Sequence, residues 1–188
     1  MSGPLFLCEI QREQRRRGGQ GFREMFYIII GQSGSGKTTF TKENFLMGDI
    51  KVVEDILPYS VCSNGMIALG RYDIGKRTEG TDTLSYSAKW KIKKQLRRLK
   101  DRNLVLEGDR INNKEIFEFI LSLGVDTKLF LITCSLRTSL ERLRAAGSMI
   151  TPAFVKMTKT KSERMYIDYC QRFHGEIINT DKTGGKRK

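Results

Sequence analysis

The chain alternates short apolar runs with segments whose apolar residues recur every three or four positions. Residues 25–30 form one continuous apolar run, which is typical of a strand buried on both faces. Similar runs predict further strands at 49–55, 104–106, 127–134 and 176–180. The periodic segments predict helices at 38–46, 84–101, 113–124, 135–147 and 151–173. Strands that alternate with helices indicate an α/β domain whose parallel sheet is covered by helices on both faces.

One segment departs from this alternation. Residues 59–72 contain two short apolar runs on either side of the pair Asn64-Gly65. An Asn-Gly pair in this setting predicts a β-hairpin with a type I′ turn. We therefore expect a small β-hairpin insertion within the α/β domain.

Composition divides the chain into three parts. Residues 1–24 are polar, basic and glycine-containing, which predicts a flexible arm. The folded domain is expected to span 25–181, and 182–188 form a basic tail. Met25 opens the ordered pattern, so it is also a candidate start of translation.

The charge and the cysteines narrow the function classes. A net charge of +13 on 188 residues, with a pI near 9.8, favours a polyanionic partner such as nucleic acid or nucleotides. The alternative is a basic protein that is merely soluble. The four cysteines form no C-x-x-C pair, which argues against a zinc site or disulfide framework and for a cytoplasmic location. No apolar run approaches the ~20 residues of a membrane span.

The first apolar run leads directly into Gly31–Thr38, GQSGSGKT, which matches G-x-x-x-x-G-K-[ST]. This phosphate-binding pattern needs a strand before it and a helix after it, and the predicted elements supply both. Its glycines let backbone N–H groups wrap phosphates, and the helix N-terminus adds partial positive charge. Lys37 is expected to reach the outer phosphates of ATP, and Thr38 to ligate Mg²⁺. The expected nucleotide-binding residues of the loop are Gly31, Gln32, Ser33, Gly34, Ser35, Gly36, Lys37, Thr38 and Thr39.

The form of this loop separates classes of nucleotide-binding protein. G-x-x-G-x-G-K-T-T resembles the loops of kinases that act on small molecules and nucleic acids. The Asn-Lys-x-Asp motif that a GTPase uses to read its base is missing from the sequence, since the nearest string, NKEI, lacks the Asp. An ABC-type signature and a strand ending in adjacent Asp-Glu are missing as well. These features favour a phosphoryl-transfer enzyme over a switch.

Carboxylates follow the predicted strand in LVLEGDR, at the edge where ligands bind in open parallel sheets. Glu107 ends this strand, and Asp109 and Arg110 follow it. Glu107 is a candidate Mg²⁺ ligand together with Thr38, and either carboxylate is a candidate proton acceptor. Helix capping is the alternative role for Asp109 or Asn112.

The stretch GKRTEGTDTLS, residues 75–85, fits neither helical nor strand spacing. Its glycines allow a loop close to a substrate. The expected substrate-binding residues are Lys76, Arg77, Gly80 and Thr81, with Arg110 from the neighbouring strand end.

Asp82 in this stretch is the first candidate for the base that takes a proton from the acceptor hydroxyl. Glu107 and Asp109 follow it, and Glu54 and Asp55 at the end of the second strand are further candidates. The alternative role of Asp82 is to cap the helix expected to begin at 83–84. The expected catalytic residues are Lys37, Asp82, Glu107, Asp109 and Arg142.

The predicted helix at 135–147 carries Arg137, Arg142 and Arg144. Similar arginine pairs in nucleotide kinases lie in a lid that closes over ATP, because the guanidinium fork binds phosphate in a bidentate manner. Arg144 is therefore a candidate ATP ligand, and Asn179 and Thr180 are candidate contacts to the adenine. The alternative is that these arginines lie on solvated helix faces.

The outer face of the predicted helix at 84–101 is strongly basic. A phosphate backbone would exploit such a face through counterion release. A solvated face that keeps the protein soluble is the alternative. Trp90 is expected either to pack or to lie exposed beside an acceptor groove. The basic residues are Lys89, Lys91, Lys93, Lys94, Arg97, Arg98 and Lys100.

Together, GQSGSGKTT, LGRYD, GTDTLS, LVLEGDR and ERLRAAG resemble the bacteriophage P-loop kinases that phosphorylate 5-hydroxymethyluracil in DNA. The resemblance covers residues 25–180. It implies a P-loop NTPase-type sheet with a lid region, ATP and Mg²⁺ as cofactors, and DNA with a hydroxymethylated base as the partner and substrate. It also implies that the protein acts in the cytoplasm of a host cell. Two other functions stay open: a kinase for free nucleosides, nucleotides or small metabolites, and a non-catalytic, ATP-dependent nucleic-acid-binding module.

Overall fold

The computed structural model describes residues 24–72, 80–81, 84–85 and 88–181. The basic tail and, apart from Glu24, the predicted arm lie outside these residues. Lys76, Arg77 and Asp82 of the stretch 75–85 lie outside them as well.

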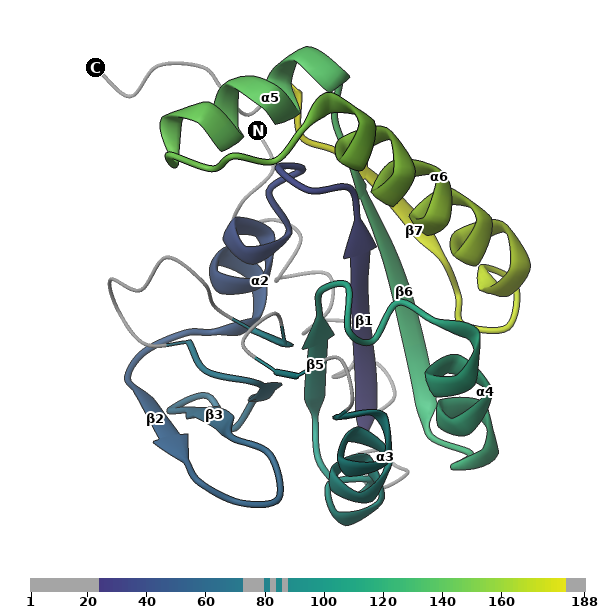
Figure 1. Cartoon of the computed structure of the whole chain (residues 1–188). Helices are drawn as coiled ribbons and strands as arrows, with labels where there is room; N and C mark the ends of the chain where they lie inside the picture. The colour runs from purple at the N-terminus through teal and green to yellow at the C-terminus, as the bar shows by residue number, and fades with distance from the viewer. Residues whose placement is uncertain (1–23, 73–79, 82–83, 86–87, 182–188) are drawn as a thin grey trace.

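Seven strands form one mixed sheet in the order β2-β3-β4-β5-β1-β6-β7 (Figure 1). The central strand β1 pairs in parallel with β5 and β6, and the pairs β4-β5 and β6-β7 are parallel too. Only β3 is reversed, since it pairs antiparallel with both β2 and β4. The strands are β1 (Met25–Gly31), β2 (Ile50–Val53), β3 (Tyr59–Cys62), β4 (Ile67–Leu69), β5 (Leu104–Glu107), β6 (Asp126–Thr133) and β7 (Glu176–Asn179).

Helices cover both faces of the sheet, as the sequence predicted. α2 packs on one face, α3, α4 and α6 pack on the other, and α5 lies beyond the carboxyl end of β1 (Figure 1). Among the described residues, no helix is both long and apolar enough to cross a lipid bilayer. The helices are α2 (Lys37–Phe45), α3 (Lys89–Arg98), α4 (Lys114–Ser122), α5 (Leu136–Ala145) and α6 (Pro152–Tyr169).

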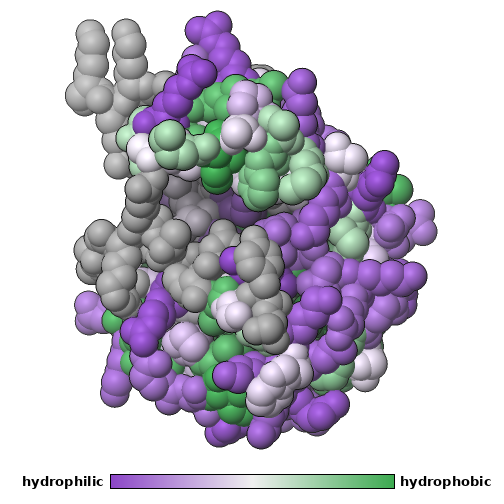
Figure 2. All heavy atoms as spheres, in the orientation of Figure 1, coloured by the Kyte–Doolittle hydropathy of each residue, from purple (hydrophilic) through white to green (hydrophobic). Residues whose placement is uncertain are grey.

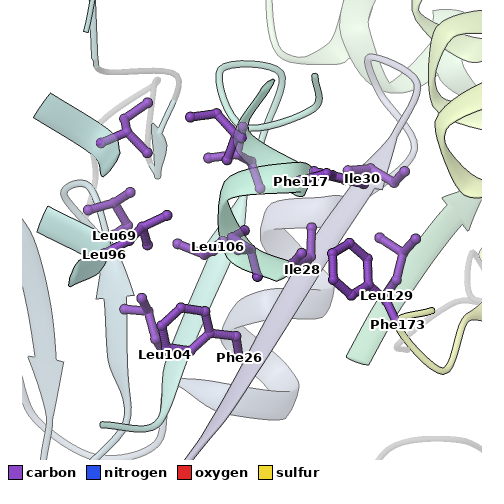
Figure 3. Packing of buried hydrophobic residues seen from close by; sticks show 14 of the residues in the cluster. Phe26, Ile28, Ile30, Leu69, Leu96, Leu104, Leu106, Phe117, Leu129 and Phe173 are labelled. Carbon is purple, nitrogen blue, oxygen red and sulfur yellow. The ribbon is translucent and has the colours of Figure 1, made fainter. Parts of the chain in front are cut away.

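The apolar run of β1 divides the core into two halves. Successive strand residues point to opposite faces. Phe26, Ile28 and Ile30 therefore pack with the helices α3, α4 and α6 (Figure 3), whereas Tyr27 and Ile29 pack with α2 on the other face. All five side chains are at most 1% exposed. This double burial explains why the run lacks the polar alternation of a half-exposed strand.

Three helices begin with the side-chain caps that their sequences favour. The side chains of Asn113, Ser135 and Thr151 each accept a hydrogen bond from a backbone N–H in the first turn of α4, α5 and α6, respectively. The residue that caps α4 is thus Asn113, and the predicted capping role of Asp109 or Asn112 is wrong. Pro152 occupies the first turn of α6, where its missing N–H has no cost.

The β3-β4 hairpin is present, but its turn differs from the predicted type. The Gly65 N–H donates to the carbonyl of Cys62 at 2.9 Å, which places Ser63 and Asn64 at the centre of the turn. A type I′ turn needs positive φ at both central residues, and among the described residues His174 is the only non-glycine residue with positive φ. Gly65 takes that conformation alone, at φ +82°. The loop is therefore one residue longer than an Asn-Gly type I′ hairpin.

Helix α3 is shorter than the predicted helix at 84–101. The expected apolar stripe is correct, because Leu84, Ala88, Ile92, Leu96 and Leu99 all lie in the core. Regular helix begins only at Lys89, however, and the position before it is Ala88, which offers no side-chain cap. The helix therefore does not begin at 83–84 as expected, and Asp82, the predicted alternative cap, lies outside the described residues.

Candidate functional site

The glycine-rich loop joins β1 to α2 at the carboxyl edge of the sheet. Gly31 has φ +155° and Gly34 has φ +76°, both in regions that side chains disfavour. Space forbids a side chain as well: a Cβ on Gly31 would lie 2.2 Å from the carbonyl oxygen of Ile132, and one on Gly34 would lie 2.6 Å from that of Ser139. The glycines thus let the loop pass directly against β6 and α5.

Lys37 stands at the first position of α2 and folds back across the loop. Its Nζ donates to the carbonyl oxygens of Gly31 at 3.1 Å and Gln32 at 3.0 Å. The sequence analysis expected this lysine to reach the outer phosphates of ATP, and that role stays a prediction. The ammonium lies over the concave loop, and the N-terminus of α2 adds to its positive field.

Two side chains tie the loop to the surrounding elements. The Gln32 amide, 1% exposed, donates to the Ser139 hydroxyl at 2.7 Å and to the carbonyl of Cys134 at 3.0 Å. The N–H of Ser33 donates to the Thr158 hydroxyl on α6 at 3.2 Å. We expected Gln32 to contribute to nucleotide binding, but its side chain anchors the loop. The backbone carbonyl oxygen of Gln32 accepts a hydrogen bond from Lys37.

Glu107 brings the strand end of β5 to the start of α2. Its carboxylate is 2% exposed, and it accepts hydrogen bonds from the hydroxyls of Thr38 at 2.6 Å and Tyr72 at 2.7 Å. The two predicted Mg²⁺ ligands are thus in direct contact, although they lie 69 residues apart in sequence. A buried carboxylate of this kind needs such donors, because burying an unpaired charge is costly.

The predicted substrate residues Gly80 and Thr81 lie on the other side of Glu107. A Cβ on Gly80 would lie 2.8 Å from the Tyr72 hydroxyl and 3.3 Å from a carboxylate oxygen of Glu107. The N–H of Gly80 donates to the carbonyl of Arg71 at 2.8 Å, and the Thr81 hydroxyl donates to the backbone carbonyl of Glu107. This part of the stretch 75–85 is therefore held at the carboxyl ends of β4 and β5.

Asp109 and Arg110 are placed less directly at the loop. Asp109 forms an ion pair with Lys161 of α6 at 2.7 Å, and about a third of its side chain is exposed. Arg110 donates from Nε to the carbonyl of Leu84 at 2.9 Å, so it supports the segment that leads into α3. Both residues link the strand end to neighbouring elements. Their predicted catalytic and substrate roles stay predictions.

Of the candidate lid arginines, Arg142 reaches the glycine-rich loop. Its guanidinium donates to the Thr180 hydroxyl at 2.9 Å, to the Thr180 carbonyl at 2.8 Å and to the carbonyl of Ser35 at 3.3 Å. The Thr180 hydroxyl also donates to the Ser35 carbonyl at 2.7 Å. The end of β7 is thus fastened to the loop through Arg142 and Thr180.

The other residues predicted for the lid and for the adenine contact form no hydrogen bond or ion pair with the glycine-rich loop among the described residues. Arg144 lines a shallow groove on α5 with Leu136, Arg137, Leu140 and Glu141. Arg137 pairs with Glu141 at 2.8 Å and is 88% exposed, so it fits the solvated alternative. The exposed Asn179 accepts at its side-chain oxygen from the N–H of Asp181 at 2.8 Å. Thr39 is exposed on the first turn of α2.

Asp181 holds the N-terminus of α5 beside the loop. Its carboxylate accepts from the N–H of Ser135 at 2.9 Å, and its pKa is lowered chiefly by a hydrogen bond from the Thr138 side chain and then by that backbone N–H. The positive end of a helix favours such a negative charge. This carboxylate stabilises the junction of β6, α5 and the end of β7.

The residues at this edge fit ATP with Mg²⁺. Thr38 and Glu107 supply hard oxygen donors, and proteins usually bind Mg²⁺ through one or two carboxylates completed by phosphate oxygens and water. The glycine-rich loop and Lys37 offer the matching phosphate cradle. The hydroxyl of Ser35, fully buried in this loop, has no hydrogen-bond partner among the described residues.

Two residues of the site, Tyr72 and Thr158, were not predicted from the sequence. Tyr72 follows β4 and donates a hydrogen bond to Glu107, and the Thr158 hydroxyl accepts one from the loop. Thr180, for which a contact to the adenine was predicted, donates a hydrogen bond to the loop. Tyr72 could have been found, because the hairpin that precedes it returns the chain to the same sheet edge as Glu107. Thr158 could not, since its contact with the loop depends on how α6 packs.

Comparisons with known proteins returned only distant structural similarity. A scan against protein-family models and a search of curated proteins found no match. A structure of deoxyadenosine kinase from M. mycoides with bound dCTP is 13% identical, with a TM-score of 0.42, over 85% of this chain and 94% of that one. A second structure of that enzyme, with bound dATP, is 12% identical, with a TM-score of 0.40, over 84% and 92% of the two chains.

Proposed function

We propose that this chain is an ATP-dependent phosphotransferase with a hydroxyl acceptor. The observation that carries the proposal is the contact between Thr38 and Glu107, beside a complete glycine-rich loop with Lys37 folded over it. Thr38 and Glu107 are side chains suited to Mg²⁺, and their contact lies at the first turn of α2, directly after the glycine-rich loop.

In the proposed reaction the acceptor hydroxyl oxygen attacks the γ-phosphorus. The bond from the γ-phosphorus to the β–γ bridging oxygen breaks, ADP leaves, and the hydroxyl proton passes to a carboxylate. Mg²⁺ supplies charge neutralisation on the phosphates when it is bound. Lys37 and the loop N–H groups hold the transferred group, and most of the rate comes from positioning and electrostatic stabilisation.

The proton acceptor in this proposal is Asp82. Glu107 is buried under the hydroxyls of Thr38 and Tyr72, and Asp109 is paired with Lys161, so each has another structural role. Asp82 follows Thr81 directly in the sequence, and Thr81 lies at Glu107. Replacing Asp82 by Asn is expected to abolish transfer and to spare ATP binding. Normal turnover of this variant would exclude Asp82 as the base.

The acceptor we propose is a 5-hydroxymethylpyrimidine, 5-hydroxymethyluracil above all, in DNA. The sequence resemblance to phage DNA-base kinases and the net charge of +13 support it. The target base would have to be single-stranded or turned out of the duplex, because a stacked and paired base cannot enter an active-site pocket. The phosphate placed on it would be a leaving group for a later substitution.

One assay separates this function from its alternatives. Radiolabelled ATP is incubated with hydroxymethylpyrimidine DNA, ordinary DNA and a panel of free nucleosides, with Lys37→Ala as the catalytic control. Label in hydroxymethylated DNA alone supports the proposal. Label in a free nucleoside instead contradicts the DNA acceptor, and ATP-modulated DNA binding without transfer contradicts phosphotransfer altogether.

A further inference from the structure

Helix α3 presents a dense basic surface to solvent. Ile92, Gln95 and Leu96 face the core, which leaves the remaining positions of the helix outside. In Figure 2 the surface over α3, in the lower part of the view, is mostly hydrophilic. The exposed residues of the helix and its end are Lys89, Trp90, Lys91, Lys94, Arg97, Arg98, Lys100, Asp101 and Arg102.

Some of the basic residues of α3 form ion pairs with acidic side chains, and others do not. Lys89 and Lys93 bind Glu115 of α4, and Arg98 binds Asp55. Lys91, Lys94, Arg97 and Lys100 form no ion pair with any residue that the structure describes. Arg97 also lies over the Phe119 ring, at 5.3 Å from its centroid. A run of cations that form no ion pair, along one helix face, is complementary to a row of phosphates.

Trp90 is the second feature of this surface. It is 59% exposed, which is unusual for so large an aromatic side chain, and the expected packing role is therefore wrong. The ammonium of Lys91 lies 5.6 Å from the centroid of its ring. An exposed indole beside lysines offers a base a stacking platform and offers the adjoining phosphate a cation.

The topology directs this surface toward the candidate site. α3 connects the carboxyl end of β4 to the amino end of β5, which pair in parallel, so the first turn of the helix lies toward the edge that holds Glu107. The ion pair of Lys89 with Glu115, in the first turn of α4, agrees with this direction. Trp90 and Lys91 are thus on the part of α3 nearest to the phosphate loop.

We propose that Trp90, Lys91, Lys94 and Arg97 form a docking surface for a single strand of nucleic acid. A base stacks on the Trp90 ring while the phosphodiester backbone runs along the cations toward Glu107. This inference rests on the proposed function only for the direction in which the strand runs, toward Glu107. The binding itself needs neither ATP nor phosphoryl transfer. The chemistry recognised, a base on a phosphodiester backbone, is shared by single-stranded DNA and RNA.

The chain contains one tryptophan and six tyrosines, so tryptophan emission, excited where tyrosine does not absorb, reports on Trp90 alone. Titration of the full chain with a thymidine oligomer is expected to quench this emission, and heparin, which is polyanionic but has no bases, is expected to bind without comparable quenching. A uridine oligomer and a duplex of matched length form the other arms. Quenching by both oligomers assigns the surface to single strands in general, and quenching by the DNA alone restricts it to DNA. Equal affinity for duplex and single strand, with no change in emission, would overturn the proposal.

Variants separate stacking from charge. By fluorescence anisotropy of labelled DNA, Trp90→Ala is expected to weaken binding roughly 5- to 150-fold, the equivalent of about 1–3 kcal/mol for one stacked base, while Trp90→Phe retains most of the affinity. The double variant Lys91→Ala, Lys94→Ala is expected to lower the salt slope of the affinity by about 1.4, at about 0.7 per phosphate contact.

A matched pair of lysines provides the control. Lys156 and Lys159 have the same spacing on α6, so Lys156→Ala, Lys159→Ala removes the same two charges elsewhere and is expected to leave the slope unchanged. Equal losses in both double variants would mean that only net charge matters and would refute the surface. A protein that binds DNA through Trp90 and transfers no phosphate would refute the proposed function alone. Unaltered DNA phosphorylation and binding by Trp90→Ala would refute this surface alone.

Discussion

Tyr72→Phe tests whether Glu107 is a buried, ionised carboxylate held by hydroxyl donors. The substitution removes a single oxygen from a side chain that is 1% exposed and leaves the ring in place. The atom removed is the donor of a 2.7 Å hydrogen bond to a carboxylate oxygen of Glu107. We expect the variant to unfold at lower temperature, because the carboxylate loses a donor where water cannot replace it.

The size of the effect follows from the charge of the acceptor. A hydrogen bond to a charged group contributes about 1.5–3 kcal/mol. For a chain of 188 residues, each kcal/mol lowers Tm by about 2–4 °C, so the expected loss is about 3–12 °C. A neutral, protonated Glu107 would need the donor less, and the loss would then fall toward the lower end or below it.

Thermal unfolding followed by circular dichroism measures this difference. Tyr59→Phe is the matched control, because it deletes the same atom on the neighbouring strand β3, where no hydrogen bond of its hydroxyl is found among the described residues. We expect the control to melt close to the wild type. A Tyr72→Phe protein that melts within about 1 °C of the control would contradict a hydrogen bond to a charged carboxylate, because losing such a bond lowers Tm by more than that.

Three further changes test the loop and its supports. Gly34→Ala is expected to destabilise the fold by about 1–3 kcal/mol in urea unfolding, because its Cβ would lie 2.6 Å from the Ser139 carbonyl oxygen. A variant with wild-type stability would show that the loop does not pass this close to α5. Arg142→Ala removes charged hydrogen bonds to Thr180, so the KM for ATP should rise about tenfold in a steady-state assay. An unchanged KM would exclude a role of Arg142 in holding the loop. Asp181 has a lowered pKa, so the stability it contributes is present above the ordinary carboxyl pKa of about 3.9 and is lost as the pH falls through its own pKa. The Tm gap between wild type and Asp181→Asn should therefore narrow in acid, and a gap independent of pH would contradict this.

Much of the fold could be predicted because its elements have clear local signals. A fully apolar strand such as β1 is recognisable without tertiary information, and so is the glycine-rich loop after it, whose residue types are dictated by backbone conformation. The caps Ser135 and Thr151 also lie where the sequence places helix starts. These features depend on neighbours in sequence, which is why they could be anticipated.

The rest of the site depends on contacts between distant segments. The bond from Thr38 to Glu107 could be anticipated only as two residues at one sheet edge, whereas the contact of Thr158 with the loop became visible only through the packing of α6. The beginning of the predicted helix at 84–101 was wrong for a related reason. Leu84 and Ala88 fit the helical stripe because they face the core, yet the chain reaches that core before regular helix begins at Lys89.

Phosphoryl transfer to a hydroxyl is tested most directly by phosphorus NMR of a reaction containing the full chain, ATP, Mg²⁺ and single-stranded DNA with 5-hydroxymethyluracil. A phosphomonoester signal on the DNA should grow in step with ADP, and Lys37→Ala should abolish both. Formation of ADP with inorganic phosphate and no phosphomonoester would identify an ATPase and contradict phosphoryl transfer to a hydroxyl. The same result with every hydroxyl acceptor would leave the contact of Thr38 with Glu107 as a nucleotide-binding feature alone.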